Sequence, residues 1–250
     1  MKKQRLGTAM TLIVASLCTT AWATAGDTAP WSYSAPTGPQ NWGELKSEYS
    51  LCSSGQTQSP IDIRDAVKTD LEPLNFTYHS GKATVVNNGH TIQVTPENAG
   101  GINLASGHYS LVQLHFHTPS EEMIQGRIFP MDAHLVHRNA AGELAVVAVV
   151  FEEGAHNPDL EPVLAAMPKN TGGTANLEAI NVAQLLPANH NAYSYMGSLT
   201  TPPCTEGVRW NVLTTPLEIS RAQLEAFQVL YPMNSRPVQP LNGRSVHVGG

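Results

Sequence analysis

The chain has no run of like charges, no heptad pattern, no internal repeat and no excess of positive charge. Its formal net charge of -6 argues against a protein that binds nucleic acid by electrostatic attraction. Nothing in the sequence indicates a coiled coil or a repeat array. Hydrophobic residues make up 41% and charged residues 14% of the 250 residues, and no shift in composition divides them. We therefore expect one ordinary globular domain.

Long apolar runs are also missing. The apolar stretch at residues 6–17 is shorter than the roughly 20 residues that a membrane-spanning helix needs. It follows a basic segment at residues 1–5 and precedes two small-x-small sites within residues 21–25, which is typical of a secretory signal. We expect residues 1–25 to be a cleaved signal peptide and the protein to be exported, to the periplasm or the medium.

Cysteine is rare, with 3 in the whole chain. Cys18 would leave with the signal peptide, so the exported chain keeps Cys52 and Cys204. An even pair in an oxidising compartment favours a disulfide. Such a bridge closes a loop of about 150 residues, worth roughly 4–5 kcal/mol on the chain-entropy model. The alternative is two buried free thiols.

Short runs of β-branched and aromatic residues predict strands at residues 76–79, 83–86 and 91–94. The Asn-Gly pair within residues 87–89 predicts a hairpin turn between the second and third of these. Residues 144–151 are apolar throughout, as expected of a central strand that is covered on both faces.

Helical spacing is found in only two places, residues 159–167 and 220–230. Asp159 and Ser220 are the expected N-caps, because a side-chain oxygen there accepts a free backbone N–H. Gln223 completes a capping box with Ser220. The sequence thus predicts many short strands, few short helices and long ordered loops.

Two strand-like stretches carry most of the histidines that matter, at residues 113–117 and 132–137. Side chains alternate between the faces of a strand, so His115 and His117 share one face. If the two stretches pair, His134 joins them while His137 points the other way. Three neutral imidazoles with an open fourth position are typical of a catalytic zinc site. The alternative is two ordinary strands with solvated histidines.

Other residues near these histidines suit a metal centre. Gln113 and Asp132 each sit two residues before a proposed ligand and could accept its second N–H. Pro202 and Pro203 stiffen the loop that carries Thr200, although such a loop is also consistent with a simple structural turn. His90 follows the Asn-Gly turn, and an ordinary histidine pKa suits proton transfer near neutrality.

Eight further short segments of the chain, together with the histidine stretches, form a pattern of motifs. They are Trp31-Ser32-Tyr33, Gly38-Pro39, Trp42-Gly43, Gln58-Ser59-Pro60-Ile61-Asp62-Ile63, Asn87-Asn88-Gly89-His90, Ser120-Glu121, residues 197–203 and Asn234-Ser235-Arg236-Pro237. With the histidine stretches, they resemble the α-class carbonic anhydrases, particularly the exported bacterial ones, over residues 31–246. The resemblance implies a mainly β (α+β) catalytic domain at residues 26–250. Its fold would be a single large, mostly antiparallel twisted sheet of about ten strands with short peripheral helices.

The resemblance also implies the reaction and the residues that perform it. The reaction is reversible hydration of carbon dioxide to bicarbonate and a proton by attack of zinc-bound hydroxide, with Zn2+ as cofactor. The resemblance also allows a homodimer as the assembly. The implied zinc ligands are His115, His117 and His134. The other implied site residues are Thr200 and Glu121 (orienting the hydroxide, with Thr200 bonded to Glu121), His90 (proton shuttle), Tyr33, Asn88 and Gln93 (water path), Val136, Val146, Leu199, Thr201, Val208 and Trp210 (substrate side), Gln113, Asp132 and the backbone of Asn234 (behind the ligands), and Cys52 with Cys204 (disulfide).

Two positions depart from the family pattern. The family usually has glutamate where this chain has Asp132, which is one methylene shorter. Glu122 stands where a histidine commonly follows the glutamate at position 121, so two acidic residues are adjacent. We expect activity to survive both changes, since neither removes a metal ligand.

Two alternatives to a carbonic anhydrase are open. His115, His117 and Glu121 match the H-x-H-x3-E spacing of a cupin, in which Glu121 would be a ligand and iron or manganese the metal. That reading leaves the Thr-Thr-Pro-Pro and Ser-Pro-Ile-Asp-Ile segments unexplained. Catalytically silent anhydrase-like domains serve as binding modules, but they generally lack a ligand histidine, and this chain has all three.

Overall fold

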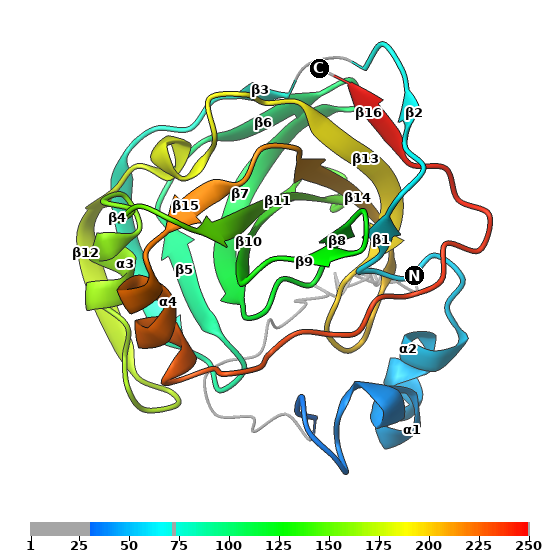
Figure 1. The fold of residues 1–250 in the computed structure, drawn as a ribbon, viewed down its shortest axis with the longest axis horizontal. Coiled ribbons are helices and arrows are strands. Elements are labelled where there is room, and N and C mark those ends of the chain that lie inside the picture. Colours follow the sequence, from blue (N-terminus) through cyan, green and yellow to red (C-terminus); the bar gives the residue numbers. More distant parts are fainter. Residues whose placement is uncertain (1–30, 72–73, 250) are drawn as a thin grey trace, which may run out of the picture.

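The computed structural model describes residues 31–71 and 74–249, so the expected signal peptide lies outside the described residues. A 13-stranded sheet dominates the fold and is shown in Figure 1. Along its main path the strands are β12 (Thr174–Ile180), β4 (Gly81–Asn87), β5 (Ile92–Pro96), β7 (Gly107–His117), β10 (Met131–Arg138), β11 (Leu144–Glu153), β14 (Glu206–Leu213), β13 (Ala192–Ser198), β16 (His247–Gly249) and β2 (Val67–Lys68).

Three further strands join this sheet beside the main path: β3 (Asn75–Phe76), β6 (Gly101–Leu104) and β15 (Leu217–Ile219). Most neighbouring strands are antiparallel, whereas β14 and β15 each run parallel to β11 and β16 runs parallel to β2. A separate three-stranded sheet consists of β1 (Asp62–Ile63), β8 (Met123–Ile124) and β9 (Arg127–Ile128). The expected large, mostly antiparallel sheet is confirmed, with three parallel pairings that the sequence did not predict.

The helices are short and peripheral, as expected. They are η1 (Pro39–Asn41), α1 (Trp42–Leu45), η2 (Ser47–Tyr49), α2 (Leu51–Ser54), α3 (Glu161–Ala165), η3 (Val182–Leu185) and α4 (Arg221–Gln228). In Figure 1, α3 and α4 lie together at one side of the sheet and α1 with α2 at another. No helix among residues 31–71 and 74–249 is long and apolar enough to span a membrane.

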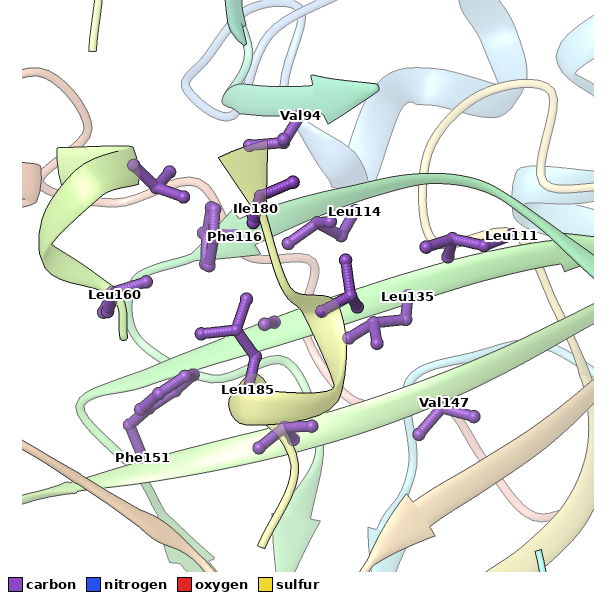
Figure 2. Packing of buried hydrophobic residues seen from close by; sticks show 14 of the residues in the cluster. Val94, Leu111, Leu114, Phe116, Leu135, Val147, Phe151, Leu160, Ile180 and Leu185 are labelled. Atoms are coloured by element: carbon purple, nitrogen blue, oxygen red, sulfur yellow. The ribbon is translucent and has the colours of Figure 1, made fainter. Parts of the chain in front are cut away.

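Alternation along the central strands gives the sheet two different apolar faces. On one face Leu114, Phe116 and Leu135 belong to the main core, which η3 and α3 cover (Figure 2). On the other face a second cluster includes Val136 and Trp210. β11 contributes to both clusters, because it is buried on both faces, as its unbroken apolar sequence predicts. The histidine face of β7 and β10 is therefore opposite the main core.

One turn and two helix N-termini were predicted from local sequence signals. The Asn-Gly turn joins β4 to β5 as predicted, and Gly89 there has φ of +88°, which glycine adopts freely. The capping box of Ser220 and Gln223 at the start of α4 is confirmed. The prediction that Asp159 caps the other helix is wrong. α3 begins after Leu160, and Asn157 Oδ1 instead accepts the backbone N–H groups of residues 159 and 160.

The N-terminal helices pack around a small third cluster. It contains Trp31, Trp42 and the two cysteines, which form the expected disulfide between Cys52 and Cys204. This bridge fastens α2 to the loop that follows β13. Because that loop also carries Thr200, the N-terminal segment and the candidate site are mechanically linked.

Candidate metal centre

The pairing of β7 with β10 brings the three predicted ligands together. His134 lies directly opposite His115, and the next pair on that side is Asp132 with His117. The ring centroids of the three imidazoles are 4.6–5.4 Å apart. His137 points to the opposite side, as predicted, and its Nε2 lies 2.6 Å from the Tyr78 hydroxyl. The alternation argument thus selected the three histidines that the fold brings together.

Each of the three imidazoles has one ring nitrogen held by a protein group. Nδ1 of His115 lies 2.8 Å from Gln113 Oε1, and Nδ1 of His117 lies 2.8 Å from the Asn234 carbonyl oxygen. Nε2 of His134 lies 3.1 Å from Glu122 Oε2. These contacts leave Nε2 of His115, Nε2 of His117 and Nδ1 of His134 free for a metal.

The spacing of the histidine nitrogens and the lack of a hydrogen-bond partner for one of them both fit a bound cation. The three histidines can each place a ligand atom within 4.8 Å of the others. His117 Nε2 is buried and has no hydrogen-bond partner, which is costly unless something else occupies its lone pair. A divalent metal with nitrogen ligands satisfies this atom directly.

Burial and neighbouring charges set the protonation of the ligands. Burial lowers the pKa of His115 well below its ordinary value, and the nearby His117 and His134 add to this effect. Burial acts in the same direction on His134, but the carboxylates of Asp132 and Glu122 outweigh it and raise its pKa. The acidic pair therefore favours positive charge on His134, which a proton or a bound cation can supply. The hydrogen bond that His134 donates to Glu122 requires a proton on Nε2 and leaves Nδ1 for that cation.

Three buried carboxylates, Glu121, Glu122 and Asp132, line the side of the centre near His134. Burial, against the opposing effect of His134, raises the pKa of Glu122 to about 7. Asp132 responds differently: burial alone would raise its pKa, but His134 and the other groups around it lower it. Its Oδ2 accepts the backbone N–H of Glu121 at 2.7 Å.

Glu121 is held in an orientation that the sequence did not predict. Its Oε1 accepts the backbone N–H of Arg236 at 2.7 Å. Its Oε2 has no hydrogen-bond partner among the described residues and lies 3.6 Å from His117 Nε2. The expected hydrogen bond from Thr200 to Glu121 is therefore not made in this structure, because the free carboxylate oxygen faces the histidine nitrogens instead.

The loop that carries Thr200 and Thr201 is anchored at both ends. Ser198 and Ser59 exchange hydrogen bonds, with Ser198 Oγ accepting the Ser59 amide at 2.9 Å and Ser59 Oγ accepting the Ser198 amide at 3.1 Å. The Cys204 amide donates to the Thr201 carbonyl oxygen at 2.9 Å, next to the disulfide. The contacts of Ser59 and Cys204 therefore hold the loop on both sides of the buried Thr200.

An apolar wall adjoins the histidines. Val136 of β10 lies opposite Val146 of β11, which in turn lies opposite Trp210 of β14, so the three side chains share one row of the sheet. Val208 belongs to the same cluster, and Leu199 packs against it. The Trp210 and His134 rings meet edge to face with centroids 4.9 Å apart. The five residues predicted for the apolar side of the site are thus gathered in one place.

His90 stands at the edge of this arrangement and is half-buried. Asn88 Oδ1 accepts the amides of His90 and of Thr91, which shapes the turn that presents the histidine. The His90 ring stacks on Trp31, with centroids 3.7 Å apart and planes 9° from parallel. Burial lowers the pKa of His90 from its ordinary value. Tyr33 also contacts Trp31, and Gln93 lies opposite His115 in the β5–β7 pairing.

Sequence reasoning missed two residues that organise the centre. Arg236 is buried and donates from its guanidinium to Gln58 Oε1 and to the carbonyl oxygens of Ser59 and Cys52. Glu122 accepts a hydrogen bond from the proposed ligand His134. The Asn-Ser-Arg-Pro motif was a signal for the first residue. Glu122 was noticed in the sequence as a departure from the family pattern, but only the fold shows that it contacts His134.

A large twisted sheet with a buried three-histidine centre beside an apolar wall defines a metalloenzyme of the mainly β class. Comparison with known proteins agrees. The family model described as eukaryotic-type carbonic anhydrase matches residues 37–249. A carbonic anhydrase of Klebsiella pneumoniae is 43% identical over 248 residues, covering 98% of this chain and 99% of that protein.

Solved structures give the same result. The α-carbonic anhydrase of Thermovibrio ammonificans, in complex with the inhibitor sulfanilamide, is 47% identical with a TM-score of 0.84 and covers 87% of this chain and 98% of its own. The α-carbonic anhydrase of Photobacterium profundum is 43% identical with a TM-score of 0.83 and covers 87% and 99%. The chain belongs to the α-carbonic anhydrase family. It is a carbonic anhydrase, and the reaction of its family is the reversible hydration of carbon dioxide.

Proposed function

We propose that the chain binds Zn2+ through Nε2 of His115, Nε2 of His117 and Nδ1 of His134, and hydrates carbon dioxide at that centre. The observation that carries this proposal is the buried Nε2 of His117, which has no protein partner and shares its surroundings with two other free imidazole nitrogens. Three nitrogen ligands and one open position suit catalytic zinc. The cupin alternative is less well supported, because the carbonic anhydrase family model matches residues 37–249.

Bound zinc would supply hydroxide at neutral pH by lowering the pKa of a water molecule to about 7, as is known for carbonic anhydrases. The protein's residues hold the reactants. Val136, Val146, Leu199, Val208 and Trp210 offer carbon dioxide an apolar surface without hydrogen-bond donors next to the histidines. Thr200 and Glu121 orient the attacking group and Thr201 lies at the bicarbonate end, as positioned donors and acceptors do.

We propose that His90 carries the product proton to solvent, with Tyr33, Asn88 and Gln93 along the path. A neutral imidazole near physiological pH can accept a proton and release it again. The lowered pKa of His90 keeps the ring neutral and ready to accept. Its stack on Trp31 defines one position of the ring.

We further propose that residues 1–25 are a signal peptide, that the catalytic domain spans residues 26–250, and that the mature protein resides in the periplasm or the medium. The disulfide between Cys52 and Cys204 supports an oxidising compartment. Mass spectrometry of the exported protein tests this, because its N-terminus should follow residue 23 or 25. A homodimer is the proposed assembly. Sedimentation of the purified protein across a concentration range distinguishes a dimer from a monomer.

Stopped-flow hydration of carbon dioxide, together with metal analysis, tests the proposal. We expect one zinc per chain, activity that a strong chelator removes and that added zinc restores, and inhibition by sulfanilamide. His117→Ala should lose zinc and activity together. His156→Ala, at an exposed histidine far from β7 in sequence, is the matched control and should keep both. Iron or manganese in the purified protein, or activity in a metal-free His117→Ala variant, would contradict the proposed centre.

A further inference from the structure

The two positions at which this chain departs from its family meet at a single atom. Glu122 stands where a histidine is common, and Asp132 stands where a glutamate is usual. Glu122 Oε2 lies 3.1 Å from His134 Nε2, whereas Asp132 Oδ2 lies 3.4 Å from the same nitrogen. Only the first of these contacts has the geometry of a hydrogen bond.

Asp132 remains near His134 but is held by another group. Its Oδ2 accepts the backbone N–H of Glu121 at 2.7 Å, so its position is fixed by the chain rather than by the histidine. Glu122, one residue further along, approaches His134 from the segment between β7 and β8. All three side chains are fully buried, so solvent does not compete for the imidazole proton.

A carboxylate at this position controls how an imidazole meets a metal. A histidine ligand donates its second N–H to an acceptor, which fixes the tautomer and the ring orientation and makes the other nitrogen a better donor of its lone pair. A proton on Nε2 of His134 leaves Nδ1 free, and Nδ1 is the nitrogen that faces the other two histidines. The acceptor of the Nε2 proton therefore selects the ligand atom.

We propose that Glu122, and not Asp132, is the positioning residue for His134, so that the changes at 122 and 132 are one compensating exchange. This inference rests on the proposed zinc centre. Asp132 instead accepts the backbone N–H of Glu121 and so holds that part of the chain. The carboxylate needed behind the third ligand has moved from β10 to the loop after β7.

The alternative for the same residues is a second metal site, because Glu122, Asp132 and His134 can also place ligand atoms within 4.8 Å of one another. Glu122 Oε1 and Asp132 Oδ1 have no hydrogen-bond partner among the described residues. However, His134 Nε2 can serve either a hydrogen bond or a second cation, and the contact to Glu122 has the length of a hydrogen bond. We therefore favour the hydrogen bond and let metal stoichiometry decide.

The test compares zinc release and the cobalt spectrum of matched variants. Glu122→Gln keeps the shape and removes the charge, and Asp132→Asn does the same at the other position. We expect Glu122→Gln to speed zinc release to a chelator about 10-fold or more and to shift the visible absorption bands of the cobalt-substituted protein. Asp132→Asn should change zinc release by less than about 2-fold. Glu143→Gln, at an exposed carboxylate in the β10–β11 turn, is the control and should change neither.

Rescue distinguishes positioning from a general loss of structure. Adding Asp132→Glu to Glu122→Gln restores an acceptor from the other side and should return slow zinc release and the native cobalt spectrum. If Glu122→Gln does not fold, Glu122→His with and without Asp132→Glu replaces it, and only the pair with the longer acid should retain zinc.

Three results would overturn the inference: Asp132→Asn releasing zinc faster than Glu122→Gln, no rescue by the longer acid, or two metals per native chain falling to one in Glu122→Gln. Failure of the native protein to bind zinc would instead refute the proposed function, so the two are distinguishable.

Discussion

Opening the disulfide gives a prediction with a magnitude that follows from the topology. Cys52 in α2 and Cys204 after β13 are separated by 152 residues. On the chain-entropy model, a loop of this length lowers the entropy of the unfolded chain by about 17 cal/mol/K, or about 5 kcal/mol at 25 °C. For a domain of this size, each kcal/mol of stability moves the melting temperature by about 2–4 °C, so removal should lower it by about 10–20 °C.

A mutant cycle gives the sharpest form of this experiment. Cys52→Ala and Cys204→Ala each open the bridge, so each single variant should lose nearly the full stabilisation and the double variant should lose little more. The assay is urea unfolding at pH 7, followed by fluorescence and circular dichroism. Thiol titration of the native protein under denaturing conditions, which should find no free thiol in the mature chain, is the control.

Additive losses of about 1 kcal/mol for each cysteine would refute the reasoning. They would show two packed side chains without a covalent link. Because Cys204 lies three residues after Thr201, the open variants should also show slower carbon dioxide hydration while folded. Unchanged turnover would mean that the serine contacts of Ser59 and Ser198 hold the threonine loop without help.

The remaining predictions concern buried or stacked side chains. Burial lowers the pKa of His137 from the ordinary 6.5 to about 4. Between these pH values the unfolded chain binds a proton at His137 and the folded chain does not, so the free energy of unfolding decreases as the pH drops from about 6.5 to about 4. This contribution is about 3 kcal/mol, and urea unfolding between pH 4 and 7 should show it in the native protein but not in His137→Gln. His90→Ala should slow steady-state turnover by about 10-fold or more in weak buffer while leaving carbon dioxide–bicarbonate exchange at equilibrium unchanged, since a positioned proton carrier contributes roughly 10²–10⁴-fold. External imidazole should restore part of that rate, and absence of rescue would assign the proton to another path. Arg236→Lys should cost about 2–4 kcal/mol, because a buried fork of three hydrogen bonds is replaced by a point charge, and a loss below 1 kcal/mol in thermal unfolding would show that those bonds contribute little.

The predictable part of the site is the part fixed by strand geometry. Alternation alone separated His134 from His137, because a strand has only two faces, and the pairing of β7 with β10 then placed the ligands. The capping box of Ser220 was equally local, since its partner Gln223 lies three residues away. Asp159 shows the limit of local reasoning. The helix begins after Leu160, and Asn157 Oδ1 accepts the amides of residues 159 and 160 just before it.

Contacts between distant segments could not be predicted. Arg236 joins residues 177–184 positions away, and nothing in its neighbourhood reveals those partners. The orientation of Glu121 depends on the same long-range contact with the Arg236 amide. Glu122 and Asp132 were noticed separately as departures from the family, yet only the fold shows that both approach His134.

His115 and His134 occupy facing rungs of one antiparallel ladder, so the gap between them is inherited from the spacing of the backbone strands. The main chain maintains that gap through its own hydrogen bonds, whatever ion the side chains hold. A stripped protein should therefore keep its shape and take up cobalt, cadmium or copper by simple exchange at neutral pH. The identity of the bound metal should then follow from the ions supplied in solution, without any change to the sequence.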